Sequence, residues 1–165
     1  MWGKIEKEIE YVKKRVSSDV VTNKIHPLTI SEIDYKLRKI HGFKGCFMHD
    51  EVVKQPPLKN NESMVINLDN SNGTGTHWVC CFSRDGNNYY FDSFGYPPSD
   101  DIKQYLSNRS SYFSSNHIQN IDSVACGYFC CYVIKEADKG VPIYDIIYKF
   151  KLNNDKSNDK IVANI

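Results

Sequence analysis

A hairpin signal near the middle of the chain constrains the fold most. Two apolar runs, at residues 76–83 and 89–94, flank a polar stretch that contains an Asp-Gly pair at 85–86. Such a pair is typical of a two-residue turn between antiparallel strands, and the turn fixes the register of both strands. In this register His77 and Asp92 lie diagonally on one face of the hairpin, where their side chains can reach each other.

Apolar residues at helical spacing predict helices on both sides of this hairpin. A first amphipathic helix is expected over residues 5–16 and ends near Ser17. A second follows Thr29, because Glu32 three residues later completes a capping-box pattern, and Gly42 is expected to stop it. Further helices are expected at residues 99–106, 125–137 and 142–152.

The segments between these elements complete the expected fold. Residues 64–68 are typical of a short buried strand and residues 117–119 of an edge strand, whereas residues 43–57 show no regular pattern. The polar tail from about residue 153 is expected to be mobile. No repeat or linker divides the sequence, so we expect one domain over residues 1–165 with an α+β fold, a central mixed β-sheet flanked by helices.

Charge and cysteine usage limit the class of protein. The 21 basic and 20 acidic residues give a net charge of +1, so no global field predicts binding to nucleic acid or to an anionic membrane. No apolar run approaches the ~18 residues that span a bilayer. Among six cysteines, the adjacent pairs at 80–81 and 130–131 lie inside apolar runs, which favours buried free thiols over a secreted disulfide framework. We therefore expect a soluble protein from a reducing compartment.

The candidate chemistry centres on Cys126, which lies at the expected start of a helix. Exposed N–H groups and the positive end of the helix dipole favour a thiolate there, and the thiolate is the nucleophilic form of cysteine. His77 could take the proton and return it, and Asp92 could fix the orientation of the imidazole ring. These three residues predict a thiol hydrolase.

Three further residues extend the predicted site. The side-chain N–H of Gln119 could stabilise an oxyanion together with the backbone N–H of Cys126. Gly127 would let a substrate approach the backbone closely, and Trp78 would form a wall that excludes water. A tunnel between Trp78 and Gly127 would admit only residues without bulky side chains.

Each of these residues alone has a simpler structural explanation, because a lone cysteine most often packs as a small hydrophobe and a lone histidine is most often structural. The joint order His, Asp, Gln, Cys is what favours a site. The residues expected to be structural or exposed are His26, His41, His49, His117, Cys46, Cys80, Cys81, Cys130 and Cys131. A zinc module is the alternative, with potential ligands at His77, Cys80, Cys81, Cys126 and Cys130. Because the sequence lacks paired Cys-x-x-Cys knuckles, neither a metal nor another cofactor is expected.

The motifs together resemble those of the adenain family of viral maturation proteases. The runs that carry the resemblance are Gly75–Val79, Tyr90–Gly95, Gln119 and Cys126–Phe129. More broadly, the order of these residues is similar to that of the clan that includes the ubiquitin-like-protein-specific proteases. The Phe-Asp-Ser-Phe-Gly and Pro-Pro stretch at Phe91–Pro98 resembles proteases of virophages and Polinton-type elements most closely. The resemblance spans roughly residues 43–137 and rests on the combined motifs.

The resemblance implies a role for each matched residue. His77 would be the general base, Asp92 its orienting partner, Gln119 the oxyanion donor and Cys126 the nucleophile. It implies a mixed sheet with the nucleophile helix packed against it. It also implies a cysteine endopeptidase that processes capsid or core precursors at glycine-containing sites during virion maturation. Such an enzyme would act as a monomer in the virion and in the cytoplasm or nucleus of the host cell.

The same resemblance leaves some partners and activities open. Adenain is stimulated by DNA and by a viral peptide that binds through a disulfide. No cysteine here matches that role, and the near-neutral charge does not predict DNA contacts, so an activating peptide or DNA stays an open question. Removal of ubiquitin-like modifiers is an alternative activity. An acetyltransferase of the same clan is another, although no glycine loop or basic cluster suited to an acyl carrier is evident.

Overall fold

The computed structural model describes residues 10, 12–13, 25–152 and 156–165. The predicted helix over residues 5–16 therefore lies largely outside the described residues. The described strands form one mixed five-stranded sheet in the order β1-β2-β3-β4-β5, with parallel pairs at both edges and antiparallel pairs between them. The strands are β1 (Phe43–Met48), β2 (Ser63–Asn67), β3 (Trp78–Arg84), β4 (Asn87–Phe91) and β5 (Ser111–Phe113). An α+β fold with a central mixed sheet is thereby confirmed.

The β3–β4 hairpin has the predicted register, with Cys80 opposite Phe91 and Arg84 opposite Asn87. The turn residues at 85–86 both have positive φ, at 49° and 78°. Two consecutive left-handed residues are what a tight hairpin turn requires, and Asp-Gly adopts them at low cost. The hairpin therefore follows directly from its turn chemistry.

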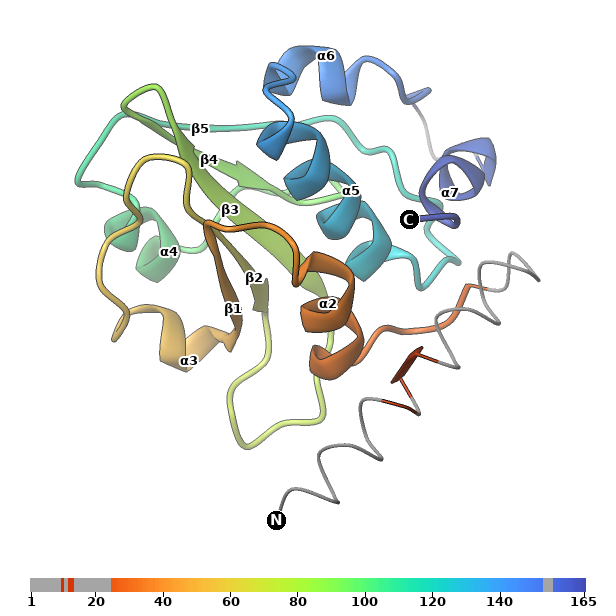
Figure 1. The fold of residues 1–165 in the computed structure, drawn as a ribbon, viewed down its shortest axis with the longest axis horizontal. Helices are drawn as coiled ribbons and strands as arrows, with labels where there is room; N and C mark the ends of the chain where they lie inside the picture. Colours follow the sequence, from red (N-terminus) through yellow and green to blue (C-terminus); the bar gives the residue numbers. More distant parts are fainter. Residues whose placement is uncertain (1–9, 11, 14–24, 153–155) are drawn as a thin grey trace.

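Helices cover both faces of the sheet (Figure 1). Their bounds are α2 (Ile30–Leu37), α3 (His49–Val52), α4 (Asp100–Tyr105), α5 (Cys126–Asp138), α6 (Ile143–Ile147) and α7 (Lys156–Val162). Apolar residues of α2, α5, α6 and α7 pack on the face that carries Cys80 and Phe82. Those of α3 and α4 pack on the face that carries Val79 and Cys81. Adjacent strand residues thus bury their side chains in opposite cores.

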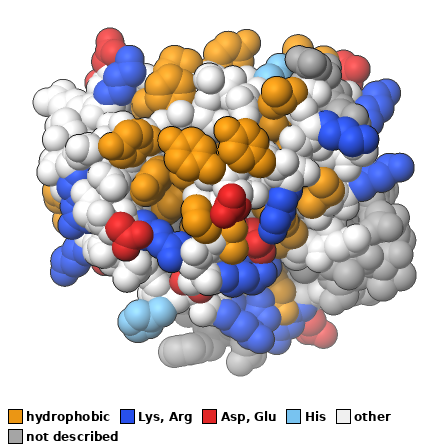
Figure 2. Space-filling view, turned by 90° about the horizontal axis from the view of Figure 1, so that it is seen from above, with side chains coloured by type: hydrophobic (Ala, Val, Ile, Leu, Met, Phe, Trp, Pro, Cys, Tyr) orange, Lys and Arg blue, Asp and Glu red, His pale blue; other side chains and the backbone are white. Residues whose placement is uncertain are grey.

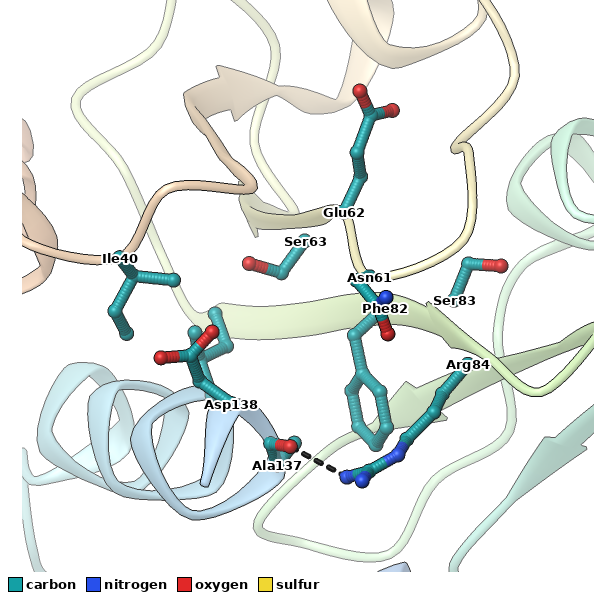
Figure 3. Close-up of a pocket in the computed structure, with 10 residues that line it drawn as sticks. Ile40, Asn61, Glu62, Ser63, Phe82, Ser83, Arg84, Ala137 and Asp138 are labelled. Carbon is teal, nitrogen blue, oxygen red and sulfur yellow. Dashed lines mark hydrogen bonds between the residues drawn. The ribbon is translucent and has the colours of Figure 1, made fainter. Parts of the chain in front are cut away.

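Helix α5 is fixed to the sheet along its length and at its C-terminal end. It packs against β3, and Arg84 at the end of that strand donates a 2.6 Å hydrogen bond to the carbonyl of Ala137. The same carbonyl, at the end of the helix, also accepts from the backbone N–H of Gly140 at 3.0 Å. Figure 3 shows the contact beside a small cavity of about 70 Å³. The opposite end of α5, where Cys126 lies, is thereby held at a defined place on the sheet.

Four predictions about secondary structure need correction. Residues 43–57 are regular, since they contain β1 and α3; Gly45, with φ of 113°, lies at a register irregularity that disrupts the alternation. The edge strand is β5, not residues 117–119, whose N–H groups at 118 and 119 bond to the carbonyl of Ser93 instead. The helix expected over residues 142–152 covers only Ile143–Ile147.

The predicted mobile tail is the fourth correction. Residues 156–162 form α7, in which Asn158 and Val162 are fully buried. The segment is polar in composition, but the side-chain amide of Asn158 donates a hydrogen bond to the carbonyl of Ile118 in the rest of the domain.

Two surface properties complete the description. Within the described residues, no helix is long and apolar enough to cross a membrane. Hydrophobic side chains gather on the face seen in Figure 2. Exposed aromatic rings on β5, on α6 and directly after α6 border a hollow of about 180 Å³. They belong to Tyr112, Phe113, Tyr144 and Tyr148.

Candidate active site

His77 and Asp92 meet at the end of the hairpin opposite its turn. His77 directly precedes β3 and Asp92 directly follows β4, so the strand register brings them together. The Nε2 of His77 lies 2.8 Å from Oδ1 of Asp92, whose side chain is only 2% exposed. The backbone N–H of Phe94 donates to the same carboxylate oxygen at 2.8 Å. The carboxylate is therefore held in place and orients the imidazole ring.

Cys126 is the first residue of α5, as predicted. The preceding residue, Ala125, has no side chain able to cap the helix, and the first turn carries no acidic residue. The N–H groups and the positive end of the dipole at this terminus are therefore not neutralised by the helix itself. The sulfur is half-buried, and it lines the same cleft as His77.

The pKa of His77 is set by its burial and by two neighbours. Burial alone would lower the pKa, but the hydrogen bond to Asp92 and the interaction with Cys126 outweigh burial and raise the pKa of His77 to about 9. Asp92 occupies Nε2, so a proton exchanged with the sulfur would pass through Nδ1. The ring of Phe94 stacks on the imidazole with 4.9 Å between centroids and an interplanar angle of 22°. At neutral pH the histidine is therefore a cation in the cleft that Cys126 lines.

Gln119 lies in the same cleft and its amide group has a fixed orientation. Its Oε1 accepts a 2.6 Å hydrogen bond from Oγ of Ser93, and its Nε2 donates to the carbonyl of Ser123 at 2.8 Å. Among the described residues, the second N–H of this amide donates to no group, and Gln119 lines the same cleft as Cys126. Ser93 thus positions Gln119, a role that we did not predict. The signal that could have identified Ser93 is its position directly after Asp92, within the motif that resembles adenain.

The cleft around these residues encloses about 790 Å³. One wall is the segment 27–30, and another is the loop 71–76 that connects β2 to β3. His77, Gln119 and Cys126 all line the cleft, so the structure brings the predicted catalytic residues to one place. A cleft of this size accommodates several residues of an extended polypeptide.

Trp78 and Gly127 do not enclose the predicted tunnel. The indole N–H of Trp78 donates to the carbonyl of Leu28 at 2.8 Å, and its ring lines the cleft. A Cβ on Gly127 would lie 3.1 Å from Cβ of Leu28 and 3.3 Å from Cδ1 of Trp78. The predicted tunnel between Trp78 and Gly127 is therefore filled by direct packing. Gly127 is outside the cleft lining, and its role is to let α5 approach Trp78 and the segment 27–30.

The other cysteines have the structural character that was predicted. Cys80, Cys81, Cys130 and Cys131 are fully buried free thiols. Burial raises the pKa of Cys46 far above its usual value, and the neighbouring carboxylate of Asp34 raises it further. Among the described residues, no three His, Cys, Asp or Glu side chains converge in a way that could hold a metal ion.

Comparison with solved structures places this geometry in a known fold. No protein-family model matches the chain, and no curated protein sequence does so either. The ASFV pS273R protease superposes with a TM-score of 0.63 at 16% identity, over 86% of this chain and 68% of that one. The SUMO protease Ulp1, solved with its catalytic cysteine oxidised to a sulfinic acid, gives a TM-score of 0.53 at 13% identity, over 96% of this chain and 93% of that one. This chain therefore has the α+β fold of these cysteine proteases.

Proposed function

We propose that the chain is a cysteine endopeptidase that processes viral capsid or core precursors during virion maturation, at glycine-containing sites. The observation that carries the proposal is the histidine that bonds to Asp92 at 2.8 Å and lines one cleft with Cys126, which raises its pKa. This arrangement supplies a base, its orienting carboxylate and a nucleophile in one cleft.

The geometry supports a two-step hydrolysis. The sulfur of Cys126 would attack the scissile carbonyl carbon, while the N–H groups of Gln119 and of Cys126 itself stabilise the oxyanion. His77 would then give its proton to the leaving amine, which breaks the C–N bond and leaves a thioester. A water molecule that loses its proton to His77 would hydrolyse the thioester and release the free sulfur.

The viral role and the substrate class have separate support. The motifs resemble those of adenain, and the ASFV protease has the same fold. The preference for glycine-containing sites is what the resemblance to adenain implies. Removal of a ubiquitin-like modifier is the second candidate, because Ulp1 is a SUMO protease and its fold covers 96% of this chain.

We expect Cys126→Ala to abolish cleavage of peptides from a fluorogenic library with glycine before the scissile bond. Cys46→Ala serves as the matched control, because Cys46 lies outside the cleft lining, and it should retain wild-type cleavage. An irreversible thiol-reactive peptide probe should label Cys126 alone among the six cysteines. Full activity in Cys126→Ala, or labelling at another cysteine, would contradict the assignment.

The same assay separates the two candidate substrates. Endopeptidase activity predicts that linear glycine-containing peptides and a capsid precursor are cleaved. An enzyme that removes modifiers would instead cleave the folded modifier fused to a reporter and leave linear peptides intact. Cleavage of the folded fusion alone would overturn the endopeptidase proposal and favour modifier removal.

A further inference from the structure

Asn67 is a buried polar residue that lines the cleft and that the proposed mechanism does not use. It is the last residue of β2, lies opposite Trp78 in the ladder and is 3% exposed. Asn67 lies two residues after Val65 in the strand, so both side chains lie on the same face of the sheet, and Val65 packs on the face that α5 covers. The side chain of Asn67 thus lies on the face of the sheet where Cys126 begins its helix, and it borders the same cleft.

The two ends of this amide group differ in what they contact. Its Oδ1 accepts hydrogen bonds from the backbone N–H groups of Asp69 at 2.9 Å and Thr76 at 3.0 Å. These bonds fix the orientation of the amide and brace the loop that leads to His77. Within the part of the chain that the structure describes, Nδ2 donates to no group. Because Nδ2 is not buried, it is accessible to the solvent of the cleft.

Gly75 keeps this nitrogen accessible. Its φ of 92° is a left-handed conformation, and a Cβ at this position would lie 3.1 Å from Nδ2 of Asn67. A side chain on residue 75 would therefore cover the donor. The loop provides an open approach to an N–H group whose direction is already fixed by the bonds on the other side of the amide.

We propose that Asn67 is a substrate-positioning residue, whose Nδ2 donates a hydrogen bond to a backbone carbonyl of the bound polypeptide. The inference rests on the proposed function and deepens it. A backbone carbonyl is the acceptor that every extended peptide presents, whatever its side chains. Since Oδ1 is engaged by two backbone donors, the amide is preorganised and does not have to be ordered when substrate binds. Asn67 and Gln119 would then hold different carbonyls of the same chain.

The variant Asn67→Asp separates this role from a purely structural one. The carboxylate keeps an acceptor for the N–H groups of Asp69 and Thr76, but it has no N–H to offer the substrate. We expect kcat/KM for a linear peptide to fall by about tenfold, mostly through KM. The rate at which iodoacetamide alkylates Cys126, and its pH dependence, should stay at wild-type values. Unchanged peptide kinetics would overturn the inference.

Substrates with an altered backbone provide the decisive measurement. In a peptide series, one amide at a time is replaced by an alkene isostere that lacks the carbonyl oxygen. With the wild type, replacement of one particular amide away from the scissile bond should lower kcat/KM by about tenfold. With Asn67→Asp, the same replacement should leave kcat/KM unchanged. Equal losses in both proteins would show that no bond joins that carbonyl to Asn67.

A second variant tests the same bond if Asn67→Asp does not fold. Gly75→Ala leaves Asn67 unchanged and places a methyl group over Nδ2. The KM of this variant for the unmodified peptide should therefore rise. An unchanged KM would contradict the inference. The two proposals fail in different ways: a wild type that cleaves no peptide would refute the endopeptidase, whereas a wild type that cleaves and an Asn67→Asp that cleaves equally would refute only the role of Asn67.

Discussion

Two neighbours of His77 set different properties of its imidazole. Asp92 fixes the ring through a buried carboxylate, and Cys126 lines the same cleft. Both neighbours raise the pKa of His77 and so favour the protonated ring. In the proposed enzyme, this imidazolium would stabilise a sulfur anion.

This arrangement predicts the pH dependence of peptide cleavage. The raised pKa means that His77 keeps its proton below about pH 9 and loses it as the pH rises through that value, so kcat/KM should fall there. In Asp92→Asn the charge and hydrogen bond that raise the pKa are weakened. The alkaline limb should then move to lower pH and kcat/KM should drop by roughly 10²-fold.

The measurement is a kcat/KM profile across the neutral and alkaline range for both proteins. Asp138→Asn, at an exposed residue at the C-terminal end of α5, is the control and should keep the wild-type profile. An alkaline limb at the same pH in wild type and Asp92→Asn would contradict the assigned role of the carboxylate.

At the residue scale, the sequence was enough to predict which side chains meet at the cleft, but not the residues that hold them in place. His77 and Asp92 could be paired because a hairpin register is fixed by its turn. Ser93 and Asn67 were not identified, because a serine or asparagine gains its role from hydrogen bonds between segments that are distant in sequence. The tunnel at Gly127 was wrong because the contact of Leu28 with α5 depends on tertiary packing.

At the scale of elements, the position of α5 depends on how closely its first turn approaches the segment 27–30. Gly127 allows this approach, because any side chain there would contact Leu28 and Trp78. The carbonyl of Leu28 in turn accepts the indole N–H of Trp78. One small residue thus lets the nucleophile helix, a strand and the segment 27–30 meet at the site.

We expect Gly127→Ala to destabilise the protein despite the higher helix propensity of alanine. The propensity gain is about 1 kcal/mol, whereas a methyl group 3.1 Å from Leu28 requires a shift that typically costs 1–3 kcal/mol. Urea unfolding should show a net loss of about 1 kcal/mol. In a Leu28→Gly background the contacts with residue 28 are gone and only the contact with Trp78 at 3.3 Å stays, so the same substitution should cost less. An equal cost in both backgrounds would contradict this account.

The elements that sequence patterns predicted well are those with local signals. The capping box at Thr29 and Glu32 forms with both hydrogen bonds, and α5 runs from Cys126 to Asp138 against an expected 125–137. β1 escaped prediction because Gly45 breaks its alternation. The β5 strand escaped as well, because its three residues are exposed and lack an apolar pattern.

At the scale of the whole molecule, α7 connects the C-terminal segment to the site. Asn158 in this helix is fully buried, and its Nδ2 donates to the carbonyl of Ile118 at 2.8 Å and to that of Lys151 at 2.6 Å. Its Oδ1 accepts from the N–H of Lys151 at 2.9 Å. Ile118 directly precedes Gln119, so this one amide holds the segment that carries the proposed oxyanion donor.

Asn158→Ala should therefore lower both stability and turnover. Three hydrogen bonds are lost and their buried partners are left without a donor or acceptor, which should lower the free energy of unfolding by about 3 kcal/mol. At low denaturant, kcat should fall because Gln119 is less well held. Lys160→Ala on the same helix changes an exposed residue and should alter stability by less than about 0.5 kcal/mol. Equal unfolding midpoints for the two variants would show that α7 does not support the site.

The hairpin and the nucleophile helix come from separate stretches of the chain, and this has a consequence for biosynthesis. A ribosome makes His77 and Asp92 first, then Gln119, and Cys126 last. A nascent polypeptide that has folded only its hairpin carries a base with no sulfur to activate. In the proposed enzyme, a translation product that ends before Cys126 would lack the nucleophile and could not cleave the proteins around it.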